Sequence, residues 1–596
     1  QVLTADAGRV DYILPRSESV ESTNTEWKLE VTIKSQAPVA SIYSPSHEVQ
    51  IERRSDNEAR VSLTSSSAAQ PGSFRLAYTT RASKNEPSLT VFTYPDYSVA
   101  DNGGDFLLMA QLPELDAKRE RVNREVTIVI DRSGSMRGEK MEQARQAALQ
   151  IIEGLRPGEP FNIIDYSDSV ESFKPAPVVK DDDTTRAAKA YIARLEANGG
   201  TNIQDALLTA LRPGPTQPLP LVLFLTDGLP TVGERSEIAI RNAAEKANTA
   251  KRRIFSFGVG LDVNSPLLTA ISTTSRGAPT FVLPKEDVEV KVSQVFRRLD
   301  GPVMEAPSLA TSETAETRIR ELQPGKLMDV FEGDQVVVLG RYVGDRPFRL
   351  ELAGNSFGRE QKFAINVDPA AGGMKSSFVP RLWATRKIGA LIDAVRQAGA
   401  DAGNANDPKM KELVDEIVRL STKFGVLTEY TAFLAVEPGQ RNHFGAPNEA
   451  GLSGHISGLP AMQKEAARRV EERNQARSGG GGVNQELNTR ELRDRLTPAE
   501  GGGRQVIIDE NLNRVEVGGV QFMNEHTLIR RGNRWVESTL IEHENEPPQR
   551  TIKFGTEDFD KILPALAKEN KQGLLARGGT VYLMLENQRT LIELGE

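Results

Sequence analysis

The chain is organised around residues 126–137, Val-Thr-Ile-Val-Ile-Asp-Arg-Ser-Gly-Ser-Met-Arg. The first five residues, four of them β-branched aliphatics, fit a strand buried on both faces, and such strands belong to parallel sheets that helices cover. These sheets bind ligands beyond the carboxyl ends of their strands, where Asp131, Ser133 and Ser135 fall. One carboxylate and two hydroxyls on a tight turn offer hard oxygen ligands, which suit Mg²⁺ or a similar cation.

Aspartate and serine before a helix are also ordinary N-caps, so this motif alone leaves two interpretations open. Two further stretches favour the metal site. Thr201 lies in a glycine turn that opens another helix, Asn198-Gly-Gly-Thr-Asn-Ile-Gln-Asp. Asp227 directly follows a second apolar strand pattern, Leu221-Val-Leu-Phe-Leu-Thr. Three loops therefore supply oxygen ligands in the order Asp/Ser/Ser, Thr, Asp.

These positions resemble the metal-ion-dependent adhesion site of the von Willebrand factor A domain. In that family two serines and a threonine bind the cation directly, and two aspartates usually act through water. The resemblance implies that Ser133, Ser135 and Thr201 are inner ligands, supported by Asp131 and Asp227. It also implies a sixth coordination position that stays open for a carboxylate of a partner. The expected cation is Mg²⁺, with Ca²⁺ and Mn²⁺ as alternatives.

Residues 124–300 alternate strand and helix patterns, which predicts a doubly wound, Rossmann-like parallel sheet. The strands are expected at 126–130, 161–166, 221–225, 254–259 and 280–283. The helices are expected at 139–154, 184–196, 203–212, 234–250, 264–274 and 287–299. The acidic run 181–183 is interpreted as a solvated turn with a helix N-cap, in preference to a calcium site.

Residues 1–118 show short alternating stretches separated by turn residues, the pattern of an antiparallel β-sandwich. Residues 42–49 and 104–109 resemble the later half of the VIT domain, which precedes the A domain in inter-α-trypsin inhibitor heavy chains and in many bacterial proteins. The chain starts with Gln1. We expect the earlier strands in a separate fragment or a preceding segment, or from another subunit. His47 is interpreted as a structural histidine.

Three further regions follow the A domain. Residues 303–437 predict a second β-sandwich and a helical segment, with Trp383 and Tyr430 as core anchors and a final strand over 426–437. This segment also resembles bacterial VIT/A-domain proteins, so the resemblance spans about residues 1–437. Residues 438–503 read as a flexible linker with a charged helix over 461–477, and residues 504–596 as a small β-rich region.

Composition narrows the class of function. The net charge of −8 argues against a nucleic-acid binder, and no apolar run reaches the roughly 18 residues of a membrane span. The absence of cysteine excludes disulfides, thiolate metal sites and cysteine nucleophiles. We find no Walker A motif, no His-rich metal centre and no Gly-x-Ser-x-Gly nucleophile elbow.

The sequence therefore predicts a non-enzymatic adhesion protein, without catalytic residues, in the extracellular space or a bacterial-like cell envelope. Its A domain would grip Asp or Glu of a protein partner, or of another copy of the chain, through the bound cation. The alternative is a structural subunit that assembles into a filament, sheet or matrix. An enzyme or an ATPase accessory factor is the third interpretation, which no motif supports.

Overall fold

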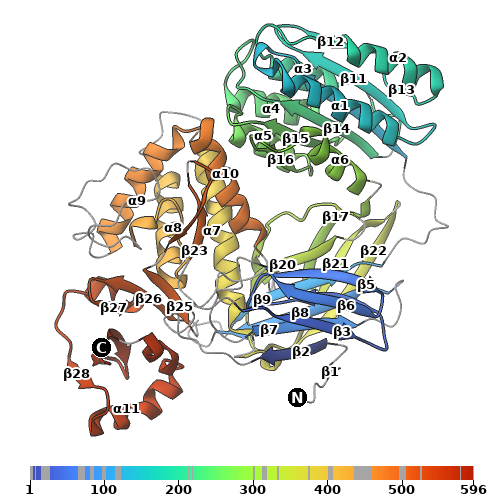
Figure 1. Cartoon of the computed structure of the whole chain (residues 1–596). Coiled ribbons are helices and arrows are strands. Elements are labelled where there is room, and N and C mark those ends of the chain that lie inside the picture. The colour runs from blue at the N-terminus through green and yellow to red at the C-terminus, as the bar shows by residue number, and fades with distance from the viewer. Residues whose placement is uncertain are drawn as a thin grey trace.

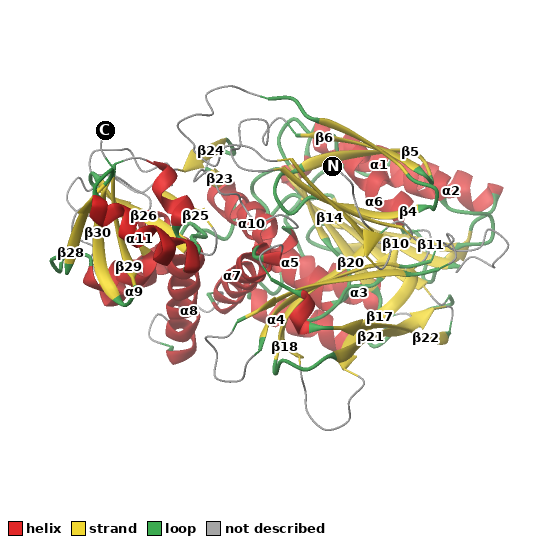
Figure 2. Ribbon diagram, turned by 90° about the horizontal axis from the view of Figure 1, so that it is seen from below, coloured by secondary structure: helices red, strands yellow, loops and turns green. Residues whose placement is uncertain are grey.

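The computed structural model shows four parts: the A domain, a β-region beneath it, a helical region beside that, and a C-terminal β-region (Figure 1). The described residues are 5–6, 9–14, 27–64, 74–80, 86–96, 103–113, 123–212, 214–217, 219–299, 302–311, 319–331, 334–356, 358–373, 376–399, 407–434, 459–495, 505–509, 511–517, 519–523, 526–577 and 579–594. Figure 2 shows the C-terminal region and the A domain at opposite ends of the molecule. Within these ranges no helix has the length and apolarity that a membrane crossing requires.

The A domain is built on a sheet of order β12-β11-β10-β14-β15-β16, in which the strands from β11 to β16 are parallel. The parallel strands are β10 (Arg124–Asp131), β11 (Pro160–Tyr166), β14 (Leu219–Thr226), β15 (Arg253–Val259) and β16 (Pro279–Val282). The helices are α1 (Glu139–Gly154), α2 (Asp182–Ala193), α3 (Ile203–Leu211), α4 (Glu237–Ala247), α5 (Ser265–Thr274) and α6 (Val288–Arg298).

Helices cover both faces of the sheet. Successive side chains of a strand point to opposite faces, so neighbouring residues are buried in two different cores. Ile128 joins the core under α1, α2 and α6, and its neighbour Val129 joins the core under α3, α4 and α5. The predicted doubly wound fold is therefore confirmed. Two short antiparallel edge strands, β12 (Val170–Ser172) and β13 (Val178–Val179), were not predicted, since they are too short for a periodic pattern.

The β-region is made of strands from both sides of the A domain. Strand β9 (Gly104–Gln111) pairs antiparallel with β20 (Gln335–Tyr342) along its full length, in a sheet of order β18-β20-β9-β8. The predicted separation into a sandwich over 1–118 and another over 303–437 is therefore wrong at this point. In the sequence, the A domain and the β-strands of residues 302–331 both lie between these two neighbouring strands.

Four sheets form this region, in two facing pairs. One core lies between β18-β20-β9-β8 and β19-β17-β21-β22, and another between β1-β2-β7-β4 and β3-β6-β5. The remaining strands are β1 (Ala5–Asp6), β2 (Arg9–Leu14), β3 (Glu30–Lys34), β4 (Val39–Tyr43), β5 (Val49–Ser55), β6 (Glu58–Leu63), β7 (Phe74–Thr80), β8 (Ser88–Pro95), β17 (Pro302–Thr311), β18 (Ile319–Gln323), β19 (Val330–Phe331), β21 (Phe348–Ser356) and β22 (Arg359–Val367).

The helical region contains α7 (Phe378–Ala398), α8 (Pro408–Phe424), α9 (Leu459–Asn474) and α10 (Gly479–Asp494), with the strand pair β23 (Gln505–Ile508) and β24 (Arg514–Val517). Trp383 and Tyr430 are buried in its core, as predicted. The strand predicted over 426–437 is wrong as far as the chain is described: these residues form a turn and a short 3₁₀ segment. The Thr428 and Thr431 hydroxyls accept backbone N–H groups there, which closes the turn.

The predicted flexible linker over 438–503 contains two packed helices. α10 begins within the glycine run at Gly479 and packs along α7, with Gln485 and Glu486 fully buried. A glycine run is flexible only where no contacts with the rest of the protein fix its backbone. Here the Gly479 N–H donates to the Leu261 carbonyl oxygen of the A domain at 2.7 Å, and the Ser265 hydroxyl donates to the Gly482 carbonyl oxygen at 2.9 Å.

The C-terminal region is a mixed sheet of order β25-β26-β27-β29-β30-β28. Its strands are β25 (Val520–Met523), β26 (His526–Arg531), β27 (Arg534–Glu537), β28 (Arg550–Lys553), β29 (Thr580–Leu585) and β30 (Gln588–Glu593). Helix α11 (Glu557–Lys568) buries Phe559, Ile562 and Leu566 against this sheet. The last two strands of the chain, β29 and β30, pair antiparallel, so the region predicted as β-rich is a sheet with one α-helix packed on it.

Candidate metal centre

Asp131 is the last residue of β10 and is fixed by its neighbours on both sides. Its Oδ1 accepts the Ser133 backbone N–H at 2.8 Å. Its Oδ2 accepts the Thr226 hydroxyl of β14 at 2.7 Å and the Tyr166 hydroxyl of β11 at 3.3 Å. Because these three strands are adjacent and parallel, their carboxyl ends meet at one edge and hold the carboxylate there.

Ser133 and Ser135 follow in the turn before α1. Their Oγ atoms are 3.0 Å apart, and the Ser135 hydroxyl donates to Oδ1 of Asp227 at 2.8 Å. This turn is tied to the loop before α3, because the Gly134 N–H donates to the Gly199 carbonyl oxygen at 2.9 Å. The residues that follow β10 and those that follow β14 therefore converge at the same point.

Thr201 reaches the same point from the third loop. Its backbone N–H donates to the Thr231 hydroxyl at 2.8 Å, so this loop is tied to the one after Asp227. A Cβ added to Gly228 would lie 3.5 Å from Thr201 Oγ1 and 3.7 Å from Ser135 Oγ. The two hydroxyls thus flank Gly228, and the structure brings all five predicted residues together at the carboxyl edge of the sheet.

The oxygen spacing fits a small divalent cation. At an Mg–O distance of about 2.0–2.1 Å, neighbouring corners of an octahedron lie about 2.9 Å apart. The separation of 3.0 Å between the oxygens of Ser133 and Ser135, which are expected as inner ligands, matches that edge. Among the described residues, no group of three or more His, Cys, Asp and Glu side chains could hold a metal, so the hydroxyls of this cluster are essential to the candidate.

The carboxylates of Asp131 and Asp227 are both fully buried, and burial makes their negative charges unfavourable unless a cation or a proton compensates them. Burial raises the pKa of Asp131 to about 6, although the hydrogen bonds from Thr226 and Ser133 oppose the shift. A proton therefore competes with a cation for this carboxylate below about pH 6. Ser135, by contrast, is exposed and opens the cluster to solvent.

Sequence reasoning missed Lys140, the second residue of α1. Its Nζ lies 2.7 Å from Oδ2 of Asp227. A signal existed, because the first turn of a helix favours anions and a lysine there runs against the helix dipole.

Two other predicted assignments can be placed in the structure. His47 is buried between the Trp27 and Phe74 rings, with Nδ1 2.9 Å from the Ser46 hydroxyl, as a structural histidine would be. Asp181 caps α2 by accepting the Thr184 N–H at 2.7 Å. Both residues lie outside the cluster around Asp131.

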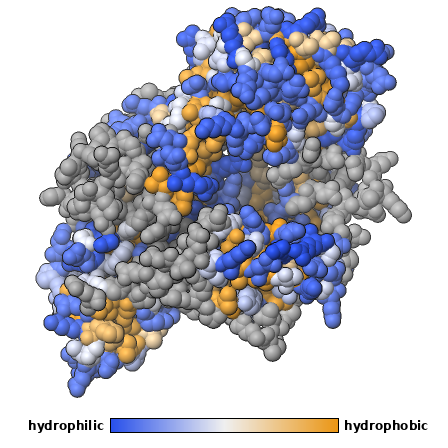
Figure 3. Space-filling view, viewed as in Figure 1, coloured by the Kyte–Doolittle hydropathy of each residue, from blue (hydrophilic) through white to orange (hydrophobic). Residues whose placement is uncertain are grey.

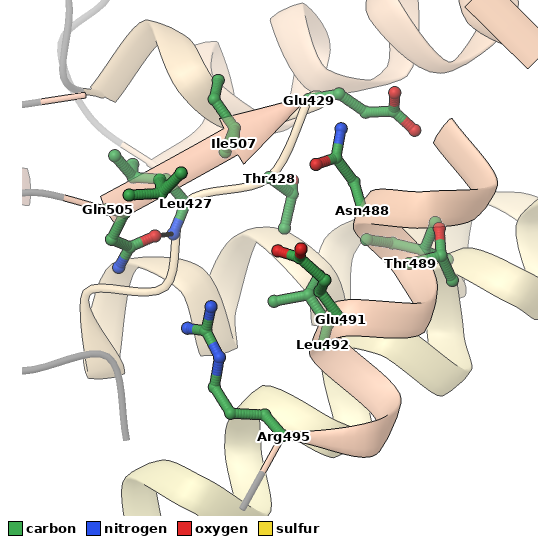
Figure 4. A pocket seen from close by; sticks show the side chains of 12 residues that line it. Leu427, Thr428, Glu429, Asn488, Thr489, Glu491, Leu492, Arg495, Gln505 and Ile507 are labelled. Atoms are coloured by element: carbon green, nitrogen blue, oxygen red, sulfur yellow. Dashed lines mark hydrogen bonds between the residues drawn. The ribbon is translucent and has the colours of Figure 1, made fainter. Parts of the chain in front are cut away.

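A small pocket lies between α10, β23 and the turn at Thr428 (Figure 4). Asn488, which lines it, uses its amide to dock the strand, since Nδ2 donates to the Ile508 carbonyl oxygen at 2.9 Å and Oδ1 accepts the Ile508 N–H at 2.8 Å. The pocket has a volume of about 20 Å³, which is room for a single water molecule. This pocket is a packing feature, and it offers no room for a ligand.

Comparison with known proteins supports the fold. The family model of the von Willebrand factor type A domain matches residues 124–281. The chain is 26% identical over 342 residues to "Inter alpha-trypsin inhibitor, heavy chain 4" of Mus musculus, which covers 54% of this chain and 35% of that protein. It is 24% identical over 336 residues to inter-alpha-trypsin inhibitor heavy chain H3 of Homo sapiens, covering 53% and 37%. The chain spans about a third of the length of these relatives.

Among solved structures, a von Willebrand factor type A protein from Catenulispora acidiphila aligns with a TM-score of 0.42 and 18% identity. That alignment covers 57% of this chain and 87% of the other. The fold and the family match identify a protein that contains a von Willebrand factor type A domain, over residues 124–281. Within that class it is distantly related to the inter-α-trypsin inhibitor heavy chains, over about half of its length.

The predicted resemblance is thus confirmed, whereas the assignment of residues 1–118 to part of a VIT domain stays a prediction. A von Willebrand factor type A domain indicates a role in protein interaction or adhesion.

Proposed function

We propose that this chain is a non-enzymatic adhesion protein that grips an acidic side chain of a protein partner through a divalent cation. The observation that carries the proposal is the hydroxyl and carboxylate cluster at the carboxyl edge of the sheet. Ser133, Ser135 and Thr201 would hold the ion, and Mg²⁺ is the cation that the oxygen spacing fits, with Ca²⁺ and Mn²⁺ as alternatives. The ion supplies a Lewis-acidic position that an anionic oxygen can occupy.

Other residues near the proposed ion are placed so that they would support its binding and that of a partner. Asp131 accepts the Thr226 hydroxyl and Asp227 accepts the Ser135 hydroxyl, which fixes the orientation of both carboxylates beside the candidate ligands. Leu229, two residues after Asp227 in the same loop, is 37% exposed, so a large apolar side chain is in contact with water near the site. A partner that places a carboxylate at the ion can cover this leucine, which adds a hydrophobic contribution to binding.

Self-assembly is the second candidate, with the acidic ligand supplied by another copy of the chain. It is favoured by β5, which lies at the edge of the sheet β3-β6-β5 and is exposed over residues 50–55. An edge strand with unpaired backbone groups is a template for pairing with another chain. Ile51 on this strand is 43% exposed, so the edge is also partly apolar.

The proposed location is the extracellular space or the cell envelope, because a cation-dependent grip on other proteins serves adhesion there. Protease shaving of intact cells that express the full-length protein tests it. Loss of the protein from shaved cells supports the location, and full protection in cells that stay sealed contradicts it.

The binding function is tested on sensor surfaces coated with poly-L-glutamate or, as the neutral comparison, poly-L-glutamine. We expect the wild-type chain to bind the glutamate surface in Mg²⁺ and to be released by EDTA. Thr201→Ala should lose this binding, whereas Thr209→Ala, a threonine of α3 whose hydroxyl bonds the Asp205 carbonyl oxygen, should retain it. Equal binding in Mg²⁺ and EDTA would exclude a metal-bridged grip. Particles that grow in Mg²⁺ and dissociate in EDTA, followed by light scattering, would identify another copy as the partner.

A further inference from the structure

We infer that Lys140 is a built-in counter-cation of the metal centre: it weakens the binding of the divalent ion and strengthens the hold of the loaded site on a carboxylate. The inference rests on the proposed function, since it concerns the same cluster. It assigns a role to a residue that lies outside the set of predicted ligands.

The position of the lysine is defined by contacts on two sides. Its Nζ is 2.7 Å from Oδ2 of Asp227, while Oδ1 of the same carboxylate accepts the Ser135 hydroxyl at 2.8 Å. A Cβ added to Gly260 would lie 3.6 Å from Nζ, so the loop after β15 borders the ammonium. One carboxylate therefore links the lysine to a candidate ligand of the ion.

Burial makes this ion pair consequential. The Asp227 side chain is fully buried and that of Lys140 is 35% exposed, so the ammonium lies between the buried carboxylate and solvent. A buried carboxylate without a partner is strongly unfavourable. Without a metal, Lys140 supplies the compensating charge, and the protein can fold with the site empty. A divalent ion that enters must then share Asp227 with a cation already present.

The sum of the charges in the metal-loaded site also supports this role of Lys140. The carboxylates of Asp131 and Asp227 would together neutralise a divalent ion, and Lys140 leaves one positive charge in excess. A partner carboxylate brings the sum to zero. Lys140 therefore acts in opposite directions on the two binding steps, because it repels the metal and attracts the anion.

Opposite shifts are the signature to measure. We expect Lys140→Met to bind Mn²⁺ at least about tenfold more tightly, since a positive charge a few ångströms from the ion is removed. Electron paramagnetic resonance of free Mn²⁺ gives this affinity. At saturating Mn²⁺ the same variant should bind the poly-L-glutamate surface more weakly than the wild type. Lys140→Arg keeps the charge and should stay close to the wild type in both measurements.

Lys189→Met is the matched control, because Lys189 pairs with Glu153 at 2.6 Å on the surface of α2. It should change neither affinity. If Lys140→Met binds both Mn²⁺ and glutamate more weakly, the lysine merely positions Asp227 and the inference is wrong. Unchanged affinities overturn it as well. A wild-type protein that binds no Mn²⁺ would contradict the proposed function itself, so the two failures are distinguishable.

Discussion

Buried carboxylates lie at both edges of the A-domain sheet. At the amino edge, Arg124 makes a two-pronged pair with Glu159 at 2.9 Å. Arg252 donates to Glu125 at 2.6 Å, and both side chains are fully buried. At the carboxyl edge, Asp165 pairs with Arg132 at 2.5 Å and Asp227 with Lys140 at 2.7 Å, whereas the described residues place no cation within ion-pair distance of the buried Asp131. Ion pairs therefore compensate the buried carboxylates at both edges except for Asp131, whose negative charge remains available to an ion.

Asp105 of β9 is a buried carboxylate outside the site. Burial raises its pKa to about 7, although the Arg341 guanidinium, 3.5 Å away on the neighbouring strand, opposes the shift. The folded state therefore keeps a proton that the unfolded state has already lost above pH 4. This contribution to stability is complete below about pH 4 and is lost as the pH rises to about 7.

We expect Asp105→Asn to remove this dependence, because the amide cannot ionise. The variant should gain stability over the wild type between pH 4 and 7, by up to about 4 kcal/mol. Denaturant unfolding at a series of pH values measures the difference. A difference that stays constant across this range would show that Asp105 titrates in the folded protein as it does in the unfolded chain.

At the scale of elements, α7 and α10 approach each other at a glycine. A Cβ added to Gly389 would lie 2.9 Å from the Arg493 backbone nitrogen and 3.0 Å from Leu492 Cβ. The two helices can pack this closely because position 389 has no side chain. This contact holds α10, whose first turn also contacts the A domain.

Gly389→Ala should therefore destabilise the helical region by about 1–3 kcal/mol, the usual cost of overpacking. Gly481→Ala of α10 is the comparison, since its Cβ would make one ordinary contact, 3.5 Å from Ala476 Cβ. That change should be neutral or stabilising by up to about 1 kcal/mol, because alanine favours the helix. Thermal unfolding of both variants tests this. Equal losses of stability in the two would mean that the close approach at Gly389 has no special role.

The elements differ in how well their sequence predicts them. The parallel strands of the A domain were predictable because burial on both faces requires continuous β-branched and aliphatic residues, as in Ile128 and Val129. The first turn of α10 was not, because its glycines carry no periodic signal and are held by contacts to Leu261 and Ser265, far away in the chain. The candidate ligands were predictable from spacing, whereas the role of Lys140 depends on which loops meet.

At the scale of the whole molecule, the A domain is held at two places. Asp329 of the β-region accepts hydrogen bonds from Arg253 at 2.5 Å and Arg276 at 3.2 Å. Beside α5, Arg396 of α7 pairs with the buried Glu486 of α10 at 2.7 Å and also donates to Ser265 of the A domain at 3.1 Å. The chain enters the domain from β9 and leaves it into β17, which belong to two facing sheets of the β-region, so the domain is tied to that region by these two connections and by the contacts above.

The surface of the A domain is mostly hydrophilic. In the view of Figure 3, hydrophilic side chains cover most of this domain.

The order of the strands in the β-region could not be predicted from the sequence, because strands β9 and β20 pair across more than two hundred intervening residues. Local patterns predict strands, but not which distant strand completes the sheet.

The central claim is that one divalent ion binds at the carboxyl edge of the A-domain sheet. The most direct measurement is equilibrium dialysis of the full chain against Mn²⁺, with the bound ion counted by electron paramagnetic resonance. We predict one tightly bound ion per wild-type chain and none in the double variant Ser135→Ala, Thr201→Ala, with both proteins folded by circular dichroism. A wild-type chain that binds no ion, or a folded double variant that still binds one as tightly, would contradict this account.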